Sequence, residues 1–258
     1  MDEGPNRQKK AEKTSPKNSS TKSIQGTFEP RWSHYFVYEF ENKDKIQPIL
    51  DSAFHKFAET PINKDDAMGR IKYALISYLT STKTENAKLY YAIIRFLIDI
   101  IDYFHQEDLI DWIHDKVIPN IESKFLYELA LLDLVEICVK LDKIERAQLY
   151  IKEIISNIAS YPSSEQYNIM NSLTQLVKRV KYVQIPSLLE IVKKGLLECE
   201  EKTNEITHKI QIIELLEDLH YIEEAFSRVV KLLKEIPQDS VKIEDLRKIK
   251  KRLSKKPL

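Results

Sequence analysis

Apolar residues recur every three or four positions along most of the chain, most regularly between Ser123 and Ile158. That spacing matches one helical turn and predicts helices with one apolar stripe each. A short, mostly polar segment, Leu141-Asp142-Lys143, separates two such stripes, and so short a link favours antiparallel neighbours. The stretch therefore predicts a helical hairpin, with Ser123 as the N-cap of its first helix. The first stripe contains Phe125, Leu126, Leu129, Leu132, Val135, Val139 and Leu141, and the second contains Ile144, Ala147, Ile151, Ile154, Ile155 and Ile158.

Similar patterns predict further helices on both sides of this hairpin. Only four glycines occur in 258 residues, and sheet proteins need more of them for their turns. We therefore expect an all-α fold, an α-solenoid of about five antiparallel helical hairpins plus a C-terminal helix. Outside the central hairpin the predicted helices cover about 46–59, 65–81, 84–104, 107–117, 163–181, 186–200, 203–219, 221–236 and 240–253.

Parts of the chain repeat one another. At an offset of 222 − 144 = 78 positions, Ile144-Glu145-Arg146-Ala147 aligns with Ile222-Glu223-Glu224-Ala225. Half this offset, 39, gives a weaker alignment in which Leu134 meets Leu173 and Ile144 meets Val183. Periods of roughly 34–47 residues are typical of helical-repeat proteins. Because a single hairpin cannot bury both of its faces, such units stack and share one continuous core.

Two segments resemble the turn between the helices of a tetratricopeptide repeat. They run from Lys140 to Ala147 and from Asp218 to Ala225, and Pro237 follows the second where that family often has a proline. The chain differs from the family at the turn glycine, which is Asp142 in one copy and His220 in the other. The resemblance covers roughly residues 123–237 and implies a tetratricopeptide-like solenoid.

This resemblance also implies a binding surface, because the first helix of each hairpin in that family lines a groove that binds peptides. The amide and basic groups that the resemblance places in this chain's groove suit a carboxylate or an acidic peptide, which they would bind through charge-assisted hydrogen bonds. The alternative is an ordinary solvated polar face, which every amphipathic helix has. Carried over by position, the middle copy supplies Asn168, Asn171, Gln175, Lys178 and Arg179, and the flanking copies supply Glu136, Lys140, Glu214 and Glu217.

Composition divides the chain into three parts: residues 1–26, 27–236 and 237–258. The first is polar, rich in Lys, Ser and Pro, and predicts a disordered tail. The second is the helical-repeat domain, and it opens on an aromatic stretch, 28–40, that either caps the first hairpin or contacts a partner. The third predicts a basic helix and tail. The formal net charge is zero, with +3 on residues 1–27 (six bases, three acids) and +6 on 241–258 (eight bases, two acids), so the middle carries −9.

Cys138 and Cys199 are the only cysteines, and each lies in an apolar helical pattern that favours a small core side chain. The first 23 residues lack the apolar run of a signal peptide. The most apolar stretch, 90–101, is interrupted by Arg95 and Asp99 and is too short to cross a bilayer. We therefore expect a cytoplasmic protein that does not insert into membranes.

Familiar catalytic motifs are absent from the sequence. It has no phosphate-binding glycine loop, no Gly-x-Ser-x-Gly elbow, no His-Glu-x-x-His and no Cys-x-x-Cys. We therefore predict a non-enzymatic module without a cofactor, which presents the solenoid groove to a protein or peptide partner.

One alternative is a metal-binding enzyme or sensor on the second hairpin. Asp102 precedes His105 by three positions, and Asp111 precedes His114 by three, so each pair shares one helical face. Two such faces together suit a metal, as in di-iron bundles. The simpler interpretation is that these residues lie at solvated helix ends.

A second alternative is a nucleic-acid-associated regulator that uses the basic C-terminus. Clustered lysines and arginines favour phosphate contacts. Base stacking needs aromatic residues interleaved among them, and the cluster has none. Its members are Lys248, Lys250, Lys251, Arg252, Lys255 and Lys256.

Overall fold

A computed structural model describes residues 41–59, 63–79, 83–179, 185–237 and 240–256. The polar tail 1–26 and the aromatic stretch 28–40 lie outside these ranges. Within them the chain forms helices and no strand, which confirms the predicted all-α, solenoid-like fold. The α-helices are α2 (Lys43–Ala58), α3 (Lys64–Ser77), α4 (Lys83–Phe104), α5 (Asp108–Trp112), α6 (Lys124–Lys140), α7 (Ile144–Ile158), α8 (Ser163–Arg179), α9 (Pro186–Lys202), α10 (Ile206–Asp218), α11 (Ile222–Glu235) and α12 (Lys242–Leu253).

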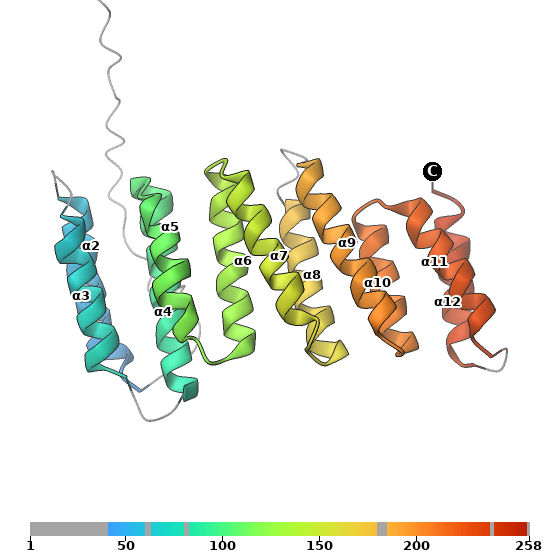
Figure 1. Cartoon of the computed structure of the whole chain (residues 1–258), viewed down its shortest axis with the longest axis horizontal. Helices are drawn as coiled ribbons and strands as arrows, with labels where there is room; N and C mark the ends of the chain where they lie inside the picture. The colour runs from blue at the N-terminus through green and yellow to red at the C-terminus, as the bar shows by residue number, and fades with distance from the viewer. Residues whose placement is uncertain (1–40, 60–62, 80–82, 180–184, 238–239, 257–258) are drawn as a thin grey trace, which may run out of the picture.

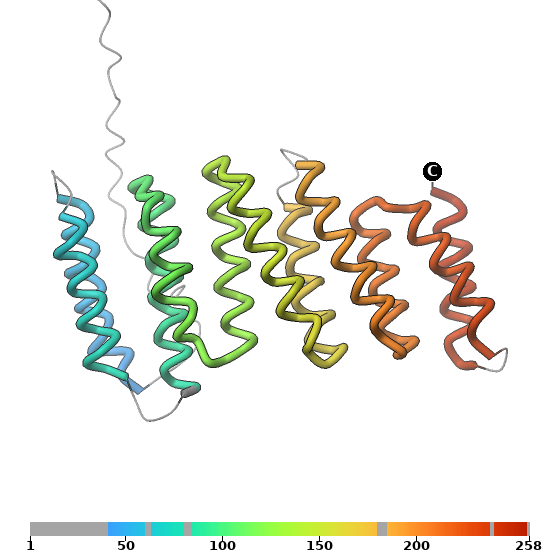
Figure 2. Tube along the Cα trace, viewed as in Figure 1, coloured from blue at the N-terminus to red at the C-terminus, as the bar shows by residue number. Residues whose placement is uncertain are grey.

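The helices stand side by side in a row with two layers (Figure 1). Helices α2, α4, α6, α8, α10 and α12 form the first layer, in which each packs against the next. The second layer, in front in Figure 1, contains α3, α5, α7, α9 and α11. The chain advances steadily along the long axis of the row (Figure 2). Because each hairpin contacts mainly its neighbours, the architecture is that of a solenoid.

Side chains meet across neighbouring hairpins at the predicted repeat spacing. A His114 ring nitrogen lies 2.9 Å from a carboxylate oxygen of Glu153, and the two residues are 39 positions apart. The Gln148 amide donates to the Ser187 hydroxyl at 2.9 Å, again across 39 positions. The weak period in the sequence is therefore close to the distance along the chain from one hairpin to the next, since other contacts of this kind span 35 to 44 positions.

The two turns that are 78 positions apart have the same backbone geometry. Asp142 has φ 57° and His220 has φ 66°, the left-handed region in which glycine is usual. In each turn the following N–H bonds back into the preceding helix, from Lys143 to Cys138 O (2.7 Å) and from Tyr221 to Leu216 O (3.0 Å). This is the Schellman arrangement, which satisfies carbonyls at the helix end. Asp142 and His220, which stand where the resembled family has its turn glycine, therefore still adopt the backbone conformation of that glycine.

One hydrophobic core extends along the whole row, from Ile46 in α2 to Leu253 in α12. Cys138 and Cys199 are buried in it, as predicted. Helix α12 contributes a complete apolar face and packs on α10 and α11, so it belongs to the stack. No helix in the described ranges is long and apolar enough to cross a bilayer. The face of α12 in the core consists of Ile243, Leu246, Ile249 and Leu253.

Two predicted helices differ most from those observed. Helix α3 stops at Ser77, short of the predicted end at residue 81, and Leu79 beyond it is 42% exposed. The predicted helix 107–117 is regular only to Trp112 and continues as a π-helical turn, Ile113–Val117. A π-turn widens the helix by one residue and often marks a functional region. This turn places His114 against α7.

Two glycines within helices are expected to change the stability in opposite directions when each is replaced by alanine. Nothing lies within 4 Å of a Cβ added at Gly69 in α3, whereas a Cβ at Gly195 in α9 would lie 2.6 Å from Cδ1 of Ile155. Gly69→Ala should raise the free energy of unfolding by about 0.5–1 kcal/mol, because alanine has the higher helix propensity. Thermal unfolding followed by circular dichroism measures this. Gly195→Ala is the matched control, and an equal gain there would show that α7 and α9 pack less closely than described.

Candidate functional site

The predicted groove residues lie on α6, α8 and α10, which are consecutive neighbours in the first layer. Their exposure falls into three groups. Asn168, Arg179, Lys140 and Glu214 are exposed, Asn171, Gln175, Lys178 and Glu136 are half-buried, and Glu217 is buried. We call this set without Glu217 the polar strip.

Glu217 lies beneath α12. Arg252 donates to its carboxylate from Nε at 3.0 Å, and Lys256 Nζ lies 2.7 Å away. Burial alone would raise the pKa of Glu217, but these two cations outweigh it and hold the pKa below its usual value. Within this structure Glu217 therefore attaches the terminal helix to α10 and does not face solvent.

Three members of the polar strip already have ionic partners. Lys178 lies 3.5 Å from Asp218, and Lys140 lies 3.4 Å from Asp102. Glu214 lies 3.7 Å from Arg252. Each of these pairs joins two neighbouring helices of the first layer, or α10 to α12. Because the pairs are exposed, each contributes at most about 1 kcal/mol to stability.

The amide side chains of the polar strip are different. Asn171 and Gln175 lie on successive turns of α8 and share one face. Both are half-buried, and neither side chain forms a hydrogen bond with any residue that the structure describes. Glu136 and Arg179 likewise form no ion pair there. The middle of the polar strip therefore offers amide donors and acceptors that nothing in the described chain uses.

The two acid-x-x-His units of the second hairpin do not converge. Asp102 is bound by Lys140, and Asp111 lies 2.7 Å from Arg146. His105 is exposed at the turn, with φ 54°. Within the described ranges no group of three or more His, Cys, Asp or Glu side chains is arranged to hold a metal ion.

His114 instead belongs to a chain of hydrogen bonds between hairpins. Its Nε2 lies 2.9 Å from Glu153, and its Nδ1 lies 2.9 Å from Asp115. The Tyr127 hydroxyl donates to the other oxygen of Glu153 at 2.7 Å. Burial alone would lower the pKa of His114, but these two carboxylates outweigh it and raise the pKa above its ordinary value.

Glu128 follows Tyr127 on α6 and is wholly buried. The Tyr161 hydroxyl donates to its Oε1 at 2.9 Å, and its Oε2 has no hydrogen-bond partner among the described residues. Burial raises the pKa of Glu128 to about 7, although Tyr161 and the Asn157 amide oppose the rise. The repeat core thus contains a carboxyl group that changes its charge near neutral pH.

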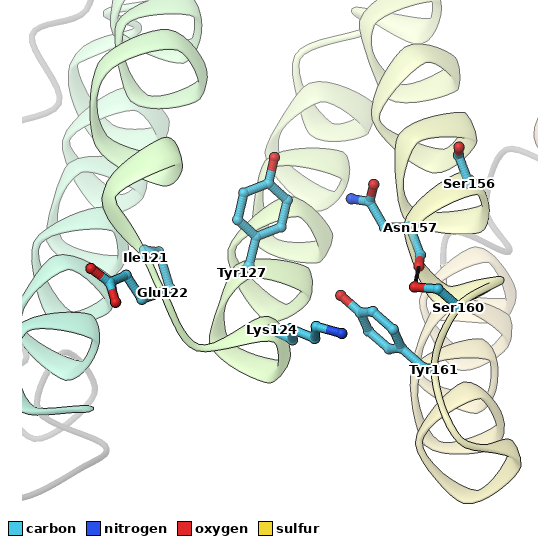
Figure 3. Close-up of a pocket in the computed structure, with 8 residues that line it drawn as sticks. All are labelled: Ile121, Glu122, Lys124, Tyr127, Ser156, Asn157, Ser160 and Tyr161. Carbon is cyan, nitrogen blue, oxygen red and sulfur yellow. Dashed lines mark hydrogen bonds between the residues drawn. The ribbon is translucent and has the colours of Figure 1, made fainter. Parts of the chain in front are cut away.

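A pocket of about 430 Å³ lies beside this carboxyl, where the start of α6 meets the end of α7 (Figure 3). Figure 3 shows Tyr127 and Lys124 on the α6 side and Asn157 and Tyr161 on the other. We call this the tyrosine pocket. Its walls are Ile121, Glu122, Lys124, Tyr127, Ser156, Asn157, Ser160 and Tyr161.

Sequence reasoning missed the tyrosine pocket. One signal was available, because Glu128 has Leu131 and Leu132 at the following helical turn and so lies among apolar positions. A glutamate in such a place is rarely buried without a partner. The partner, Tyr161, is 33 positions away in a loop, and no local pattern connects the two.

The six bases of the predicted C-terminal cluster divide into two groups. Arg252 and Lys256 face Glu217 and are part of the contact between α10 and α12. The other four are exposed: Lys248, Lys250, Lys251 and Lys255.

Neither family models, nor curated proteins, nor solved structures provide a match to this chain.

Proposed function

We propose that this protein is a non-enzymatic interaction module, a tetratricopeptide-like solenoid that binds a protein or peptide partner along the polar strip. The observation that supports this best is the pair of half-buried amides, Asn171 and Gln175, whose hydrogen-bonding groups have no partner among the described residues. Amide groups held partly out of water gain most when a ligand supplies the missing hydrogen bonds.

The surroundings of these amides suit a peptide in extended form. An extended peptide presents alternating N–H and C=O groups, and a side-chain amide can donate to one and accept from the other. Glu136 on α6 and Arg179 on α8 supply charges of both signs within the same polar strip. A peptide bound here would cross three helices of one layer, so a longer peptide would contact more of them.

The variant Asn171→Ala with Gln175→Ala tests the proposal. Mass spectrometry quantifies the proteins that the wild-type chain captures from native lysate. Their captured amount should decrease by about tenfold or more with the double variant, because two hydrogen-bonding groups are removed. Alanine preserves helix propensity, so circular dichroism should be unchanged.

Asn204→Ala is the matched control, since Asn204 is an exposed amide in the turn between α9 and α10. It should leave the captured set unaltered. The same captured set for wild type and the double variant would remove the polar strip as the binding surface. Charge reversal at Lys178 and Arg179 should also abolish capture, although Lys178→Glu also places a second acid beside Asp218.

A further inference from the structure

The tyrosine pocket lies at the loop edge of the row, formed by the first turn of α6, the last turn of α7 and the loop segments beside them. Ser156 and Asn157 belong to the carboxyl end of α7, where the helix dipole is negative. Cations are stabilised at such an end, and anions are not. The α7 side of the pocket therefore favours a positive charge, whereas the first turn of α6 on the other side opposes one.

The tyrosines of the pocket add to this preference. Tyr127 donates its hydroxyl hydrogen to Glu153, and Tyr161 donates to Glu128. Since each hydrogen is directed to a carboxylate, the phenol oxygens retain only acceptor lone pairs for a group in the pocket. The ring faces are also electron-rich and attract cations.

One carboxyl group lines the pocket, and two more accept hydrogen bonds from its tyrosines. Glu122 is in its wall, with its carboxylate directed away from Lys124 and Tyr161 in Figure 3. The buried Glu128 accepts from Tyr161, and its Oε2 is unpartnered among the described residues. Glu153 lies behind Tyr127. A cation in the pocket would stabilise the ionised form of Glu128, which burial disfavours.

The chain itself shows where such a cation can lie. Nζ of Lys124 is 4.9 Å from the centroid of the Tyr161 ring (Figure 3). Lys124 is in the first turn of α6, where the helix dipole disfavours a positive charge. It is exposed and forms no ion pair within the described part of the chain. Its ammonium group can therefore leave the ring when another cation arrives.

We propose that the tyrosine pocket binds the ammonium end of a lysine side chain from another protein, in competition with the chain's own Lys124. This site is separate from the polar strip and does not depend on it. The titratable groups in its wall are Glu122, Lys124, Tyr127 and Tyr161. Those next to it are Glu128 and Glu153, which accept from the two tyrosines, His114, which is bonded to Glu153, and Glu165, whose charge acts on Tyr161.

The test uses two small probes that differ only in charge, Nα-acetyl-lysine methylamide and Nα-acetyl-norleucine methylamide. Both are titrated into the full chain labelled with ¹⁵N, and the backbone amides of Asn157, Ser160 and Tyr161 are followed by NMR. The lysine probe should shift these signals with millimolar affinity, and the norleucine probe should not. Because the probe keeps its charge below pH 10, its binding should tighten by about threefold or more from pH 6 to pH 8, as Glu128 ionises.

Two variants separate the proposal from a weak surface effect. Lys124→Gln should tighten binding of the lysine probe by about fivefold, because the competing cation is removed. Glu128→Gln should weaken it and remove most of the pH dependence, leaving the part that comes from His114 beside Glu153. Lys250→Gln, at an exposed lysine on α12, should change nothing. Equal shifts from both probes, or an unchanged or weaker affinity in Lys124→Gln, would overturn the proposal.

Discussion

Replacing Arg228 with methionine is expected to lower the free energy of unfolding by about 3–5 kcal/mol, because it leaves a buried carboxylate without its cation. Arg228 on α11 donates from Nη1 to Glu200 on α9 at 2.7 Å, and its side chain is 16% exposed. The Glu200 side chain is only 7% exposed, and Arg228 is its sole ionic partner in the described ranges. Methionine preserves most of the packing, so the loss reports mainly on the charge.

Urea unfolding followed by circular dichroism measures this loss. Hydrogen exchange should localise it, because a solenoid is stabilised by contacts between neighbours. Protection should fall first in α11 and α12 and persist in α6 and α7. Adding Glu200→Gln to Arg228→Met should recover more than half of the loss, since the unpaired charge is then gone.

Arg252→Met is the matched control. Arg252 also holds a buried carboxylate, that of Glu217, but its own side chain is 49% exposed. Lys256 remains 2.7 Å from Glu217 when the arginine is removed. The expected loss is therefore about 1 kcal/mol. Equal losses in the two variants would show that Glu200 is better solvated than its burial indicates.

Sequence periodicity was sufficient to predict most of the fold, because helices, turns and repeat offsets each leave a local signal in the sequence. The central hairpin shows this, since Ser123 accepts the Leu126 N–H as the predicted N-cap. Even the substituted turn positions, Asp142 and His220, retain the glycine-like backbone. The π-turn after Trp112 was not predicted, because it depends on how that segment packs against other hairpins.

The candidate sites were less predictable, because they depend on which side chains meet across hairpins. Position in the repeat located Asn171 and Gln175 on one face, but it also included Glu217, which α12 covers. Nothing local indicates that the terminal helix folds back onto α10. The link between Glu128 and Tyr161 likewise depends on the stacking of hairpins and on a loop conformation.

Glu128→Gln is expected to stabilise the protein at pH 8 and to have little effect at pH 4.5. Burial raises the pKa of Glu128 from its ordinary 4.5 to about 7, so the folded state prefers the protonated form. Its stabilising contribution is therefore fully present below pH 4.5 and is lost as the pH rises to 7. At about 1.4 kcal/mol per pH unit, the wild type loses roughly 2–3 kcal/mol over this interval. Glutamine has no charge to bury and escapes this loss.

The measurement compares urea unfolding of the wild type and Glu128→Gln at pH 4.5, 6 and 8. Two histidines also titrate in this range, in opposite directions. Burial lowers the pKa of His208, so its contribution is lost as the pH falls, whereas His114 has a raised pKa and loses its contribution as the pH rises. Both are present in both proteins, so the difference between the two curves isolates Glu128. A difference that does not change between pH 4.5 and 8 would mean that folding leaves the pKa of Glu128 at its ordinary value of 4.5, and therefore that its carboxyl group is open to water.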